Sequence, residues 1–254
     1  MNIIKALCHQ GQRKIGVEKG ADILEAIIKK NKYPLSIDVI DTHKFNSLEG
    51  YKELFEKHKK YKNLVVTLGG DHSIGRSTVG SSIAKYGNDL TVIWVDAHAD
   101  IHTKETSISK NTHGMPLSTF FNLEHNEISQ NNLHLTPNDL VYFGIRDLDP
   151  PEIKFIEKLK IKYFNNIESI LDHLKSNTKK NVHISFDVDS LDPKYLDSTG
   201  TIAPNGIKPS DYIQLHNYVH RKLVGWDIVE FNPELGDKEK SKETMEYIIG
   251  NLII

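Results

Sequence analysis

The segment LTVIWVDAHADIHT (residues 90–103) joins an apolar run directly to four ionisable side chains. The run LTVIWV (90–95) is short, apolar and rich in β-branched residues, which is typical of a strand covered on both faces of a parallel sheet. After it, ionisable residues occupy every second position: Asp96, His98, Asp100 and His102. Since side chains alternate between the two faces of a strand, we expect Asp96, His98 and Asp100 to project from one face.

Strand-like and helix-like segments alternate along the rest of the chain. Seven other segments resemble the run at 90–95: IIKAL (3–7), SIDVI (36–40), NLVVTL (63–68), DLVYFGI (139–145), KIKYF (160–164), VHISFDV (182–188) and GWDIVEF (225–231). Helical patterns occur at 16–30, 151–160, 166–175 and 242–254, and the segment with Glu53, Glu56 and the basic run 57–62 also predicts a helix. This alternation predicts an α/β fold with a mainly parallel sheet in three layers. Because no Gly-, Ser- or Pro-rich linker divides the chain, we expect residues 1–254 to form a single domain.

The composition argues against several kinds of partner. The formal net charge is −2, which gives no electrostatic reason to expect nucleic acid or a membrane surface. No apolar stretch approaches the roughly 20 residues of a transmembrane helix, and the N-terminal segment predicts a strand rather than a signal peptide. Cys8 is the only cysteine, so the chain cannot form an internal disulfide and a reducing compartment is expected. We therefore expect a cytoplasmic protein.

Three of the predicted strands end in residue types that bind metal ions. The carboxyl ends of parallel strands are where ligands collect in open α/β sheets. These strand ends carry Asp71-His72, then the alternating residues 96–100, then Asp187-Val188-Asp189. Any one of them could be an ordinary turn or helix cap. Four carboxylates on neighbouring strand ends repel one another unless cations lie between them, so the three clusters together predict a dinuclear metal site.

The donor types indicate which metal would bind. Four carboxylates and two imidazoles, without a thiolate, favour a hard or borderline ion such as Mn²⁺ over tetrahedral structural Zn²⁺. Fe²⁺, Co²⁺ and Ni²⁺ are alternatives. A pair of such ions lowers the pKa of bound water and stabilises a tetrahedral centre, which is hydrolytic chemistry.

Three motifs resemble the signatures of the ureohydrolase family, which includes arginases, agmatinases and formiminoglutamases. They are GGDHS (69–73), DAHAD (96–100) and SFDVDSLDP (185–193). The similarity extends from GQRKIGVEKG (11–20) to GWDIVEFNPELG (225–236), which is nearly the whole chain. It implies a three-layer α/β/α fold around a parallel eight-stranded sheet, hydrolysis of a guanidinium or similar group with two Mn²⁺ ions, and homo-oligomers that are trimers or hexamers.

The resemblance also implies individual roles. One ion would be held by His72, Asp96, Asp100 and Asp187. The other would be held by Asp96, His98, Asp187 and Asp189, so that Asp96 and Asp187 bridge. Glu230, in an otherwise apolar strand end, matches the carboxylate that grips the guanidinium, and a buried charge there needs a cationic partner. His113 matches a mobile proton shuttle, because a neutral imidazole near pH 7 can pass a proton to the leaving amine. We expect the other histidines, such as His58, His173 and His216, to be surface or helix-cap residues.

Substrate choice depends on residues outside the metal motifs. The loop IHTKETSISKNTHGMP (101–116) resembles the arginase version, in which Ser109 and Asn111 would hydrogen-bond an α-carboxylate. The segment GIRDLDPPE (144–152) would place Asp149 and Glu152 near the α-amino group. An N-cap role for Asp149 is the alternative to this assignment. Thr201 matches a threonine that orients the guanidinium.

Two residues depart from the arginase pattern. His102 stands where arginases usually have a carboxylate-binding asparagine, and Lys110 replaces a small residue; both are potential donors toward an anion. The first hypothesis is hydrolysis of L-arginine to L-ornithine and urea by a metal-bridging hydroxide. The alternatives are agmatinase or formiminoglutamase activity, or a catalytically feeble metal-binding homologue.

Overall fold

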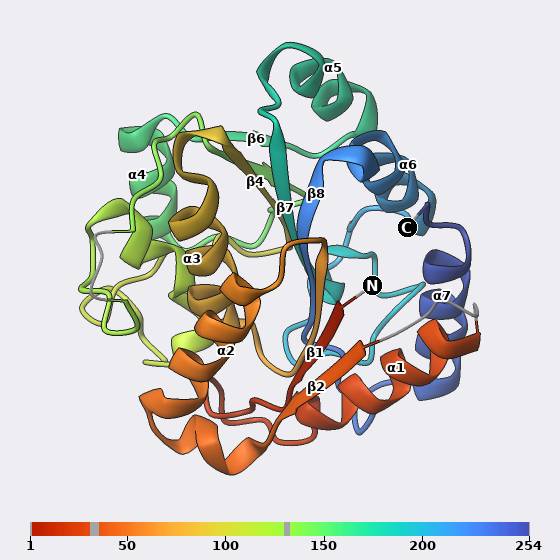
Figure 1. Cartoon of the computed structure of the whole chain (residues 1–254). Helices are drawn as coiled ribbons and strands as arrows, with labels where there is room; N and C mark the ends of the chain where they lie inside the picture. The colour runs from red at the N-terminus through yellow and green to blue at the C-terminus, as the bar shows by residue number, and fades with distance from the viewer. Residues whose placement is uncertain (1, 31–35, 130–132, 254) are drawn as a thin grey trace.

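A computed structural model describes residues 2–30, 36–129 and 133–253 (Figure 1). Eight strands form one sheet in the order β2-β1-β3-β8-β7-β4-β5-β6. Their bounds are β1 (Asn2–Ala6), β2 (Ser36–Ile40), β3 (Val65–Gly69), β4 (Leu90–Val95), β5 (Leu140–Phe143), β6 (Lys162–Phe164), β7 (Asn181–Asp187) and β8 (Leu223–Val229). Each neighbouring pair in this order is parallel. The predicted parallel eight-stranded sheet is therefore confirmed.

Helices cover both faces of the sheet. The α-helices are α1 (Gly20–Lys30), α2 (Leu48–Lys60), α3 (Gly75–Tyr86), α4 (Pro150–Leu159), α5 (Ile167–Asn177), α6 (Pro209–Val219) and α7 (Lys238–Gly250). The 3-10 turns are η1 (Val17–Lys19), η2 (Thr42–Asn46), η3 (His72–Ile74), η4 (Gly87–Asp89), η5 (Thr112–Gly114), η6 (Pro116–Phe121), η7 (Val188–Ser190) and η8 (His220–Lys222). One hydrophobic cluster joins the sheet to α1, α5, α6 and α7, and a second joins it to α2, α3 and α4 (Figure 1). This is the three-layer arrangement expected from the sequence.

The strand sequences match their places in the sheet. Every residue of β3 and β4 is buried, as their apolar sequences predicted, since helices cover both faces. The edge strands β2 and β6 are the most exposed. The observed strand ends lie within two residues of the predicted ones.

Two helices, α3 and α6, were not predicted. The sequence of α3, GRSTVGSSIAKY, has no apolar stripe, yet Ser77, Thr78, Ser81 and Ser82 on it are buried. Their hydroxyl groups bond to polar groups of other elements, so this helix packs on the sheet through hydrogen bonds as well as through apolar contact. The helix predicted at 242–254 begins earlier, at Lys238, and ends at Gly250.

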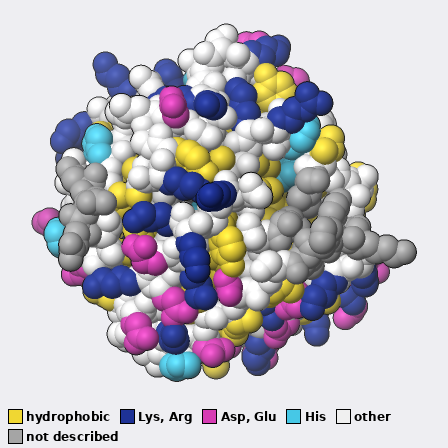
Figure 2. Space-filling view, in the orientation of Figure 1, with side chains coloured by type: hydrophobic (Ala, Val, Ile, Leu, Met, Phe, Trp, Pro, Cys, Tyr) yellow, Lys and Arg dark blue, Asp and Glu magenta, His cyan; other side chains and the backbone are white. Residues whose placement is uncertain are grey.

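The surface shows no concentration of one charge on the face drawn in Figure 2, where basic and acidic side chains are interspersed. This agrees with the small net charge of −2. Among the residues that the structure describes, no helix has the length and apolar character needed to cross a bilayer.

Candidate metal centre and substrate pocket

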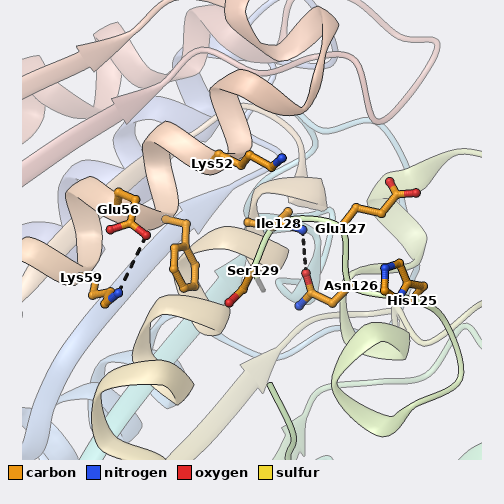
Figure 3. Close-up of a pocket in the computed structure, with 9 residues that line it drawn as sticks. Lys52, Glu56, Lys59, His125, Asn126, Glu127, Ile128 and Ser129 are labelled. Atoms are coloured by element: carbon orange, nitrogen blue, oxygen red, sulfur yellow. Dashed lines mark hydrogen bonds and ion pairs between the residues drawn. The ribbon is translucent and has the colours of Figure 1, made fainter. Parts of the chain in front are cut away.

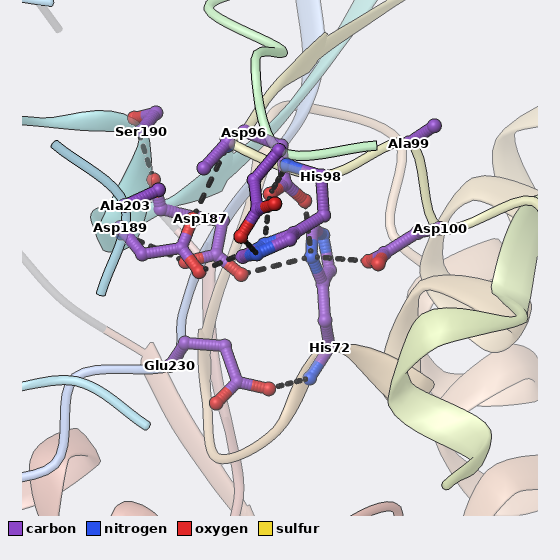
Figure 4. Close-up of polar contacts among 12 residues, drawn as sticks. His72, Asp96, His98, Ala99, Asp100, Asp187, Asp189, Ser190, Ala203 and Glu230 are labelled. Atoms are coloured by element: carbon purple, nitrogen blue, oxygen red, sulfur yellow. Dashed lines mark hydrogen bonds and ion pairs between the residues drawn. The ribbon is translucent and has the colours of Figure 1, made fainter. Parts of the chain in front are cut away.

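His72 lies among three carboxylates at the carboxyl edge of the sheet (Figure 4). It sits in η3, directly after β3, and its Nδ1 atom is 3.0 Å from Asp100 Oδ2, 3.1 Å from Asp96 Oδ2 and 3.2 Å from Asp187 Oδ2. The imidazole stacks on the Trp94 ring with centroids 4.1 Å apart. One ring nitrogen of His72 is therefore aimed at acidic oxygens that come from two other strand ends.

His98 forms the second half of the cluster. Its Nδ1 atom is 3.1 Å from Asp189 Oδ2 and 3.4 Å from Asp96 Oδ1. The two oxygens of Asp96 thus face different histidines, with Oδ1 toward His98 and Oδ2 toward His72. Asp96 Oδ2 also accepts a hydrogen bond from Trp94 Nε1 at 2.9 Å. Asp96 is the residue shared by both halves.

The backbone brings these side chains together by turning rather than by continuing as a strand. β4 ends at Val95, and Asp100 has a left-handed φ of 51°. The Asp96 carboxylate accepts the N–H of His98 at 2.7 Å, and that of Asp187 accepts the N–H of Asp189 at 2.8 Å. Short acidic side chains readily hold such turns by bonding a backbone N–H two residues on. The prediction that residues 96–100 extend the strand was wrong, although the side chains do converge.

The charges of the cluster call for cations. Four buried carboxylates face two imidazoles, so even two imidazolium ions would leave two negative charges. Burial, together with the neighbouring Asp189 and Asp96 charges, raises the pKa of Asp187 well above its usual range. Burial and the Asp96 charge raise the pKa of Asp100 to about 7. Burial opposes an imidazolium at His72, but hydrogen bonds to Asp100, Asp187 and Asp96 outweigh it and raise the pKa of that ring.

The donor set fits two divalent cations. One group of potential ligands is His72, Asp96 and Asp187, and another is Asp96, His98 and Asp189; within each, one ligand atom per residue lies within 4.8 Å of the others. Asp100 adds an oxygen beside His72. Oxygen and imidazole donors without a thiolate suit Mn²⁺ and similar ions. The structure thus brings together all six residues that the sequence predicted as ligands.

Glu230 lies beside this cluster in an unusual backbone position. It follows β8 with a φ of 64° and is buried (Figure 4). Its carboxylate accepts the N–H of His72 at 2.9 Å and the amide of Gln12 at 2.6 Å, and His113 Nδ1 lies 3.1 Å from Oε1. Burial opposes ionisation, but the hydrogen bonds with His113, His72 and Gln12 lower the pKa of Glu230. Glu230 is therefore an ionised carboxylate at neutral pH.

The contact also decides the charge of His113. Burial favours the neutral ring, but the hydrogen bond and charge of Glu230 raise the pKa of His113 to about 9. The sequence suggests a neutral imidazole near pH 7, whereas the contact with Glu230 favours the protonated ring. The difference arises from a carboxylate that lies 117 positions away in the chain.

A cavity of about 330 Å³ opens above the cluster. Twelve of the fourteen predicted site residues line it: His98, Asp100, His102, Ser109, Asn111, His113, Asp149, Glu152, Asp187, Asp189, Thr201 and Glu230. The other two, His72 and Asp96, are buried behind it. The predicted substrate residues and the predicted metal ligands therefore share one cavity.

His102 contacts two carboxylates that also line this cavity. Its Nε2 atom is 3.1 Å from Asp149 Oδ2 and 3.6 Å from Glu152 Oε2, while Nδ1 is 3.1 Å from Thr106 Oγ1. Asp149 is also the N-cap residue of α4, and its N–H donates to Glu152. The cap role considered for Asp149 and its place in the cavity thus occur together.

Lys110 does not face the cavity. Its Nζ atom donates to the carbonyl oxygens of Lys104 and Glu105, within its own loop. Its backbone has a φ of 60°, which turns the chain between Ser109 and Asn111. The suggestion that Lys110 could donate toward a bound anion was wrong, because the loop backbone already holds the ammonium group.

Two of the histidines expected at the surface are buried instead. His58 contacts Ser81 Oγ at 3.2 Å, and His216 packs edge-on against Trp226 with ring centroids 4.9 Å apart. Burial lowers the pKa of His58 to about 3 and that of His216 to about 4, so both are neutral core residues. Helical spacing could have marked both as buried, because His58 follows Leu54 and Phe55 by four and three residues. His216 likewise lies four residues after Tyr212 and three before Val219.

Sequence reasoning also missed two residues that shape the site. Gln12 bonds Glu230, as described above. Arg146 lies outside the cavity and donates to backbone carbonyl oxygens of neighbouring segments, those of Gly144, Asp189, Ser190, Ala203 and Pro204. Both residues lie in segments that carry the family resemblance, but their partners are distant in sequence and could not be read from it.

A second cavity, of about 600 Å³, lies between α2 and residues 125–129 (Figure 3). Lysine and glutamate side chains of α2 line one side of it. It contains none of the predicted site residues and no metal-capable group, among the residues described. The chemistry therefore belongs to the cavity at the strand ends, although that cavity is smaller.

Comparison with known proteins places these features in a family. A profile of the arginase family matches residues 2–254. The chain is 31% identical to an arginase of Entamoeba histolytica over 94% of this chain and 92% of that protein, and 32% identical to a Staphylococcus aureus arginase over 98% and 95%. The crystal structure of the Entamoeba histolytica arginase in complex with L-ornithine superposes with a TM-score of 0.89 at 30% identity, covering 99% of this chain and 96% of that one.

Proposed function

Because the chain belongs to the arginase family, we propose that it hydrolyses the guanidinium group of L-arginine to give L-ornithine and urea, using two Mn²⁺ ions. One observation carries the proposal. A single cavity holds a buried, ionised Glu230 next to two metal-capable groups, and two further carboxylates, Asp149 and Glu152, lie at its outer end. A substrate with a guanidinium at one end and an ammonium at the other fits this distribution of charge.

We assign the ions to the two groups of ligands that share Asp96. One ion would be held by His72, Asp96, Asp100 and Asp187. The other would be held by Asp96, His98, Asp187 and Asp189. Two divalent cations supply Lewis acidity, which lowers the pKa of water and stabilises a tetrahedral transition state.

Glu230 would bind the guanidinium through a charge-assisted pair of hydrogen bonds. Its pKa is lowered, so it keeps its charge, and the N–H of His72 fixes its orientation. A guanidinium that pairs with Glu230 competes with His113 for the same carboxylate. Once displaced, His113 holds a proton beside the reacting carbon and can deliver it to the leaving amine.

The other polar side chains of the cavity would bind the α-amino and α-carboxylate groups of the substrate. Asp149 and Glu152 suit an α-ammonium, and Ser109, Asn111 and His102 can donate to an α-carboxylate. Thr201 lines the cavity from the opposite loop. One observation favours agmatine as a second candidate: Lys110 turns away, so no lysine or arginine among the residues described lines the cavity to attract a carboxylate. The proposal also includes a cytoplasmic homo-oligomer, a trimer or hexamer, formed by a single catalytic domain.

A substrate panel tests the proposal. The protein is loaded with Mn²⁺ and given arginine, agmatine, guanidinobutyrate and formiminoglutamate in turn, and the amine product is quantified. We expect the highest kcat/KM with arginine. Activity on agmatine without activity on arginine would replace the proposal with agmatinase. Two bound ions without turnover of any of the four would leave only a metal-binding homologue.

A further inference from the structure

Behind His72, on the side away from the cavity, a chain of buried polar groups runs into the core. His72 Nε2 lies 2.9 Å from Ser185 Oγ, and Ser185 Oγ donates to Asp227 Oδ2 at 3.4 Å. All three side chains are buried, with Ser185 and Asp227 fully inaccessible. They come from three neighbouring parts of the sheet: the turn after β3, strand β7 and strand β8.

Asp227 is held in place by further partners. Thr78 Oγ1 donates to its Oδ2 at 2.5 Å, and His183 Nε2 lies 2.9 Å from the same atom. His183 is bonded in turn by Ser82 Oγ, 2.8 Å from its Nδ1. Gly225 leaves room for that ring, because a Cβ there would lie 2.3 Å from His183 Nδ1. Two hydroxyl groups of α3 thus fix this carboxylate, that of Thr78 directly and that of Ser82 through His183.

The chain of hydrogen bonds has a direction. A carboxylate can only accept, so the Ser185 hydroxyl hydrogen points to Asp227. The lone pair of Ser185 Oγ then accepts a hydrogen from His72 Nε2. A neutral ring with its hydrogen on Nε2 would direct the lone pair of Nδ1 toward a cation held among the oxygens of Asp96, Asp100 and Asp187. A histidine binds a metal ion in this form, through the nitrogen that carries no hydrogen.

We propose that Ser185 and Asp227 are positioning residues that hold His72 in the Nε2–H tautomer and thereby raise its affinity for a divalent cation. The inference rests on the proposed role of His72 as a metal ligand. Groups that bond the second nitrogen of a ligating histidine typically change metal affinity or activity 10- to 100-fold when removed. Here the carboxylate acts through an intervening serine hydroxyl, which makes the hydroxyl itself the point to test.

The test is a Mn²⁺ titration of the metal-stripped, full-length protein, followed by the electron paramagnetic resonance signal of free Mn²⁺. We expect Ser185→Ala to weaken one of the two binding steps by roughly 10-fold or more, with the other step within about threefold of the unaltered protein. Ser185→Thr keeps a hydroxyl and restores most of the affinity. Asp227→Asn weakens the same step.

Ser77→Ala is the matched control. Ser77 is equally buried, and its hydroxyl donates to the carbonyl oxygen of Tyr51 at 2.8 Å, away from the chain of bonds to His72. We expect this variant to bind both ions as before. If Asp227→Asn does not fold, the alanine and threonine variants at position 185 still decide the question.

Three results would count against the inference. Unchanged binding of both ions by Ser185→Ala overturns it directly. Equal weakening of both steps, without rescue by Ser185→Thr, assigns the serine a general packing role and also overturns it. The variant His72→Ala distinguishes the inference from the proposed function. If His72→Ala loses one Mn²⁺-binding step and Ser185→Ala loses none, only the inference is overturned. If His72→Ala keeps both binding steps, His72 is not a metal ligand and the proposed ligand set is wrong as well.

Discussion

Replacing Arg146 by lysine should loosen the wall of the cavity without changing its charge. The Arg146 guanidinium makes six hydrogen bonds to backbone carbonyl oxygens, five of 2.7–3.1 Å and a longer one of 3.4 Å to Leu191. Two of the acceptors, Asp189 and Ala203, belong to the turn that carries a predicted metal ligand and to the loop that follows Thr201. Arg146 therefore ties these two segments together.

The geometry sets the size of the effect. Lysine has three donors, so at least two of the five closer carbonyl groups lose their partner. A hydrogen bond from a charged donor contributes about 1.5–3 kcal/mol, and the half-buried position of Arg146 argues for the lower end or less. We expect Arg146→Lys to lower the free energy of unfolding by about 2–3 kcal/mol, and Arg146→Ala to lower it further because all of these bonds are lost.

Urea unfolding of the metal-free protein, followed by circular dichroism, measures this difference at constant m-value. Arg221→Lys is the control, because Arg221 is exposed, and it should leave the midpoint unchanged. A destabilisation below about 0.5 kcal/mol in Arg146→Lys, within the range of ordinary surface substitutions, would refute the reasoning. In that case the carbonyl groups are satisfied by water or by a rearranged loop.

Further predictions concern the site and the core. Asp96→Asn should abolish turnover and weaken both Mn²⁺ binding steps in a titration, because Asp96 faces both histidines; loss of only one step would contradict the shared role. His113→Asn should lower kcat while both ions remain bound by elemental analysis, and loss of an ion would place His113 in the metal centre instead. The folded-state pKa of His58, about 3, lies below its usual 6.5, so the unfolded chain binds more protons between these values and stability falls as the pH drops through this window. His58→Gln should reduce that fall in urea titrations at pH 7 and pH 5, and an unchanged pH dependence would argue against a buried neutral ring.

The strands and the metal ligands could be predicted because their signals are local. A run such as LTVIWV (90–95) predicts a buried strand from its own composition, without knowledge of its contacts. The acidic residues and histidines directly after it indicate where the strand ends. The way Asp96, His98 and Asp100 converge could not be predicted in the same way. Their positions depend on turns held by hydrogen bonds between a carboxylate and a nearby N–H, and the alternating sequence suited a strand equally well.

Structural features that depend on contacts between residues far apart in the sequence could not be predicted. Helix α3 looks like a loop because its buried face consists of serine and threonine, whose partners are His58, His183 and Asp227 from other elements. The same holds for Arg146, whose partners are backbone carbonyl groups with no side-chain signature. The contact that raises the pKa of His113 could not be predicted for the same reason, since Glu230 reaches the ring only in the folded chain.

The strand order affects when, during folding, the metal-binding groups can form. β8 is the last strand to be synthesised, yet it lies between β3 and β7 at the centre of the sheet. Without β8, the strands fall into two parts that share no pairing, β2-β1-β3 and β7-β4-β5-β6. His72 belongs to the first of these, and the aspartates around it belong to the second. The group around His72 can therefore form only when β8 joins the two parts of the sheet, whereas the group of Asp96, His98 and Asp189 comes from the β4 and β7 side alone.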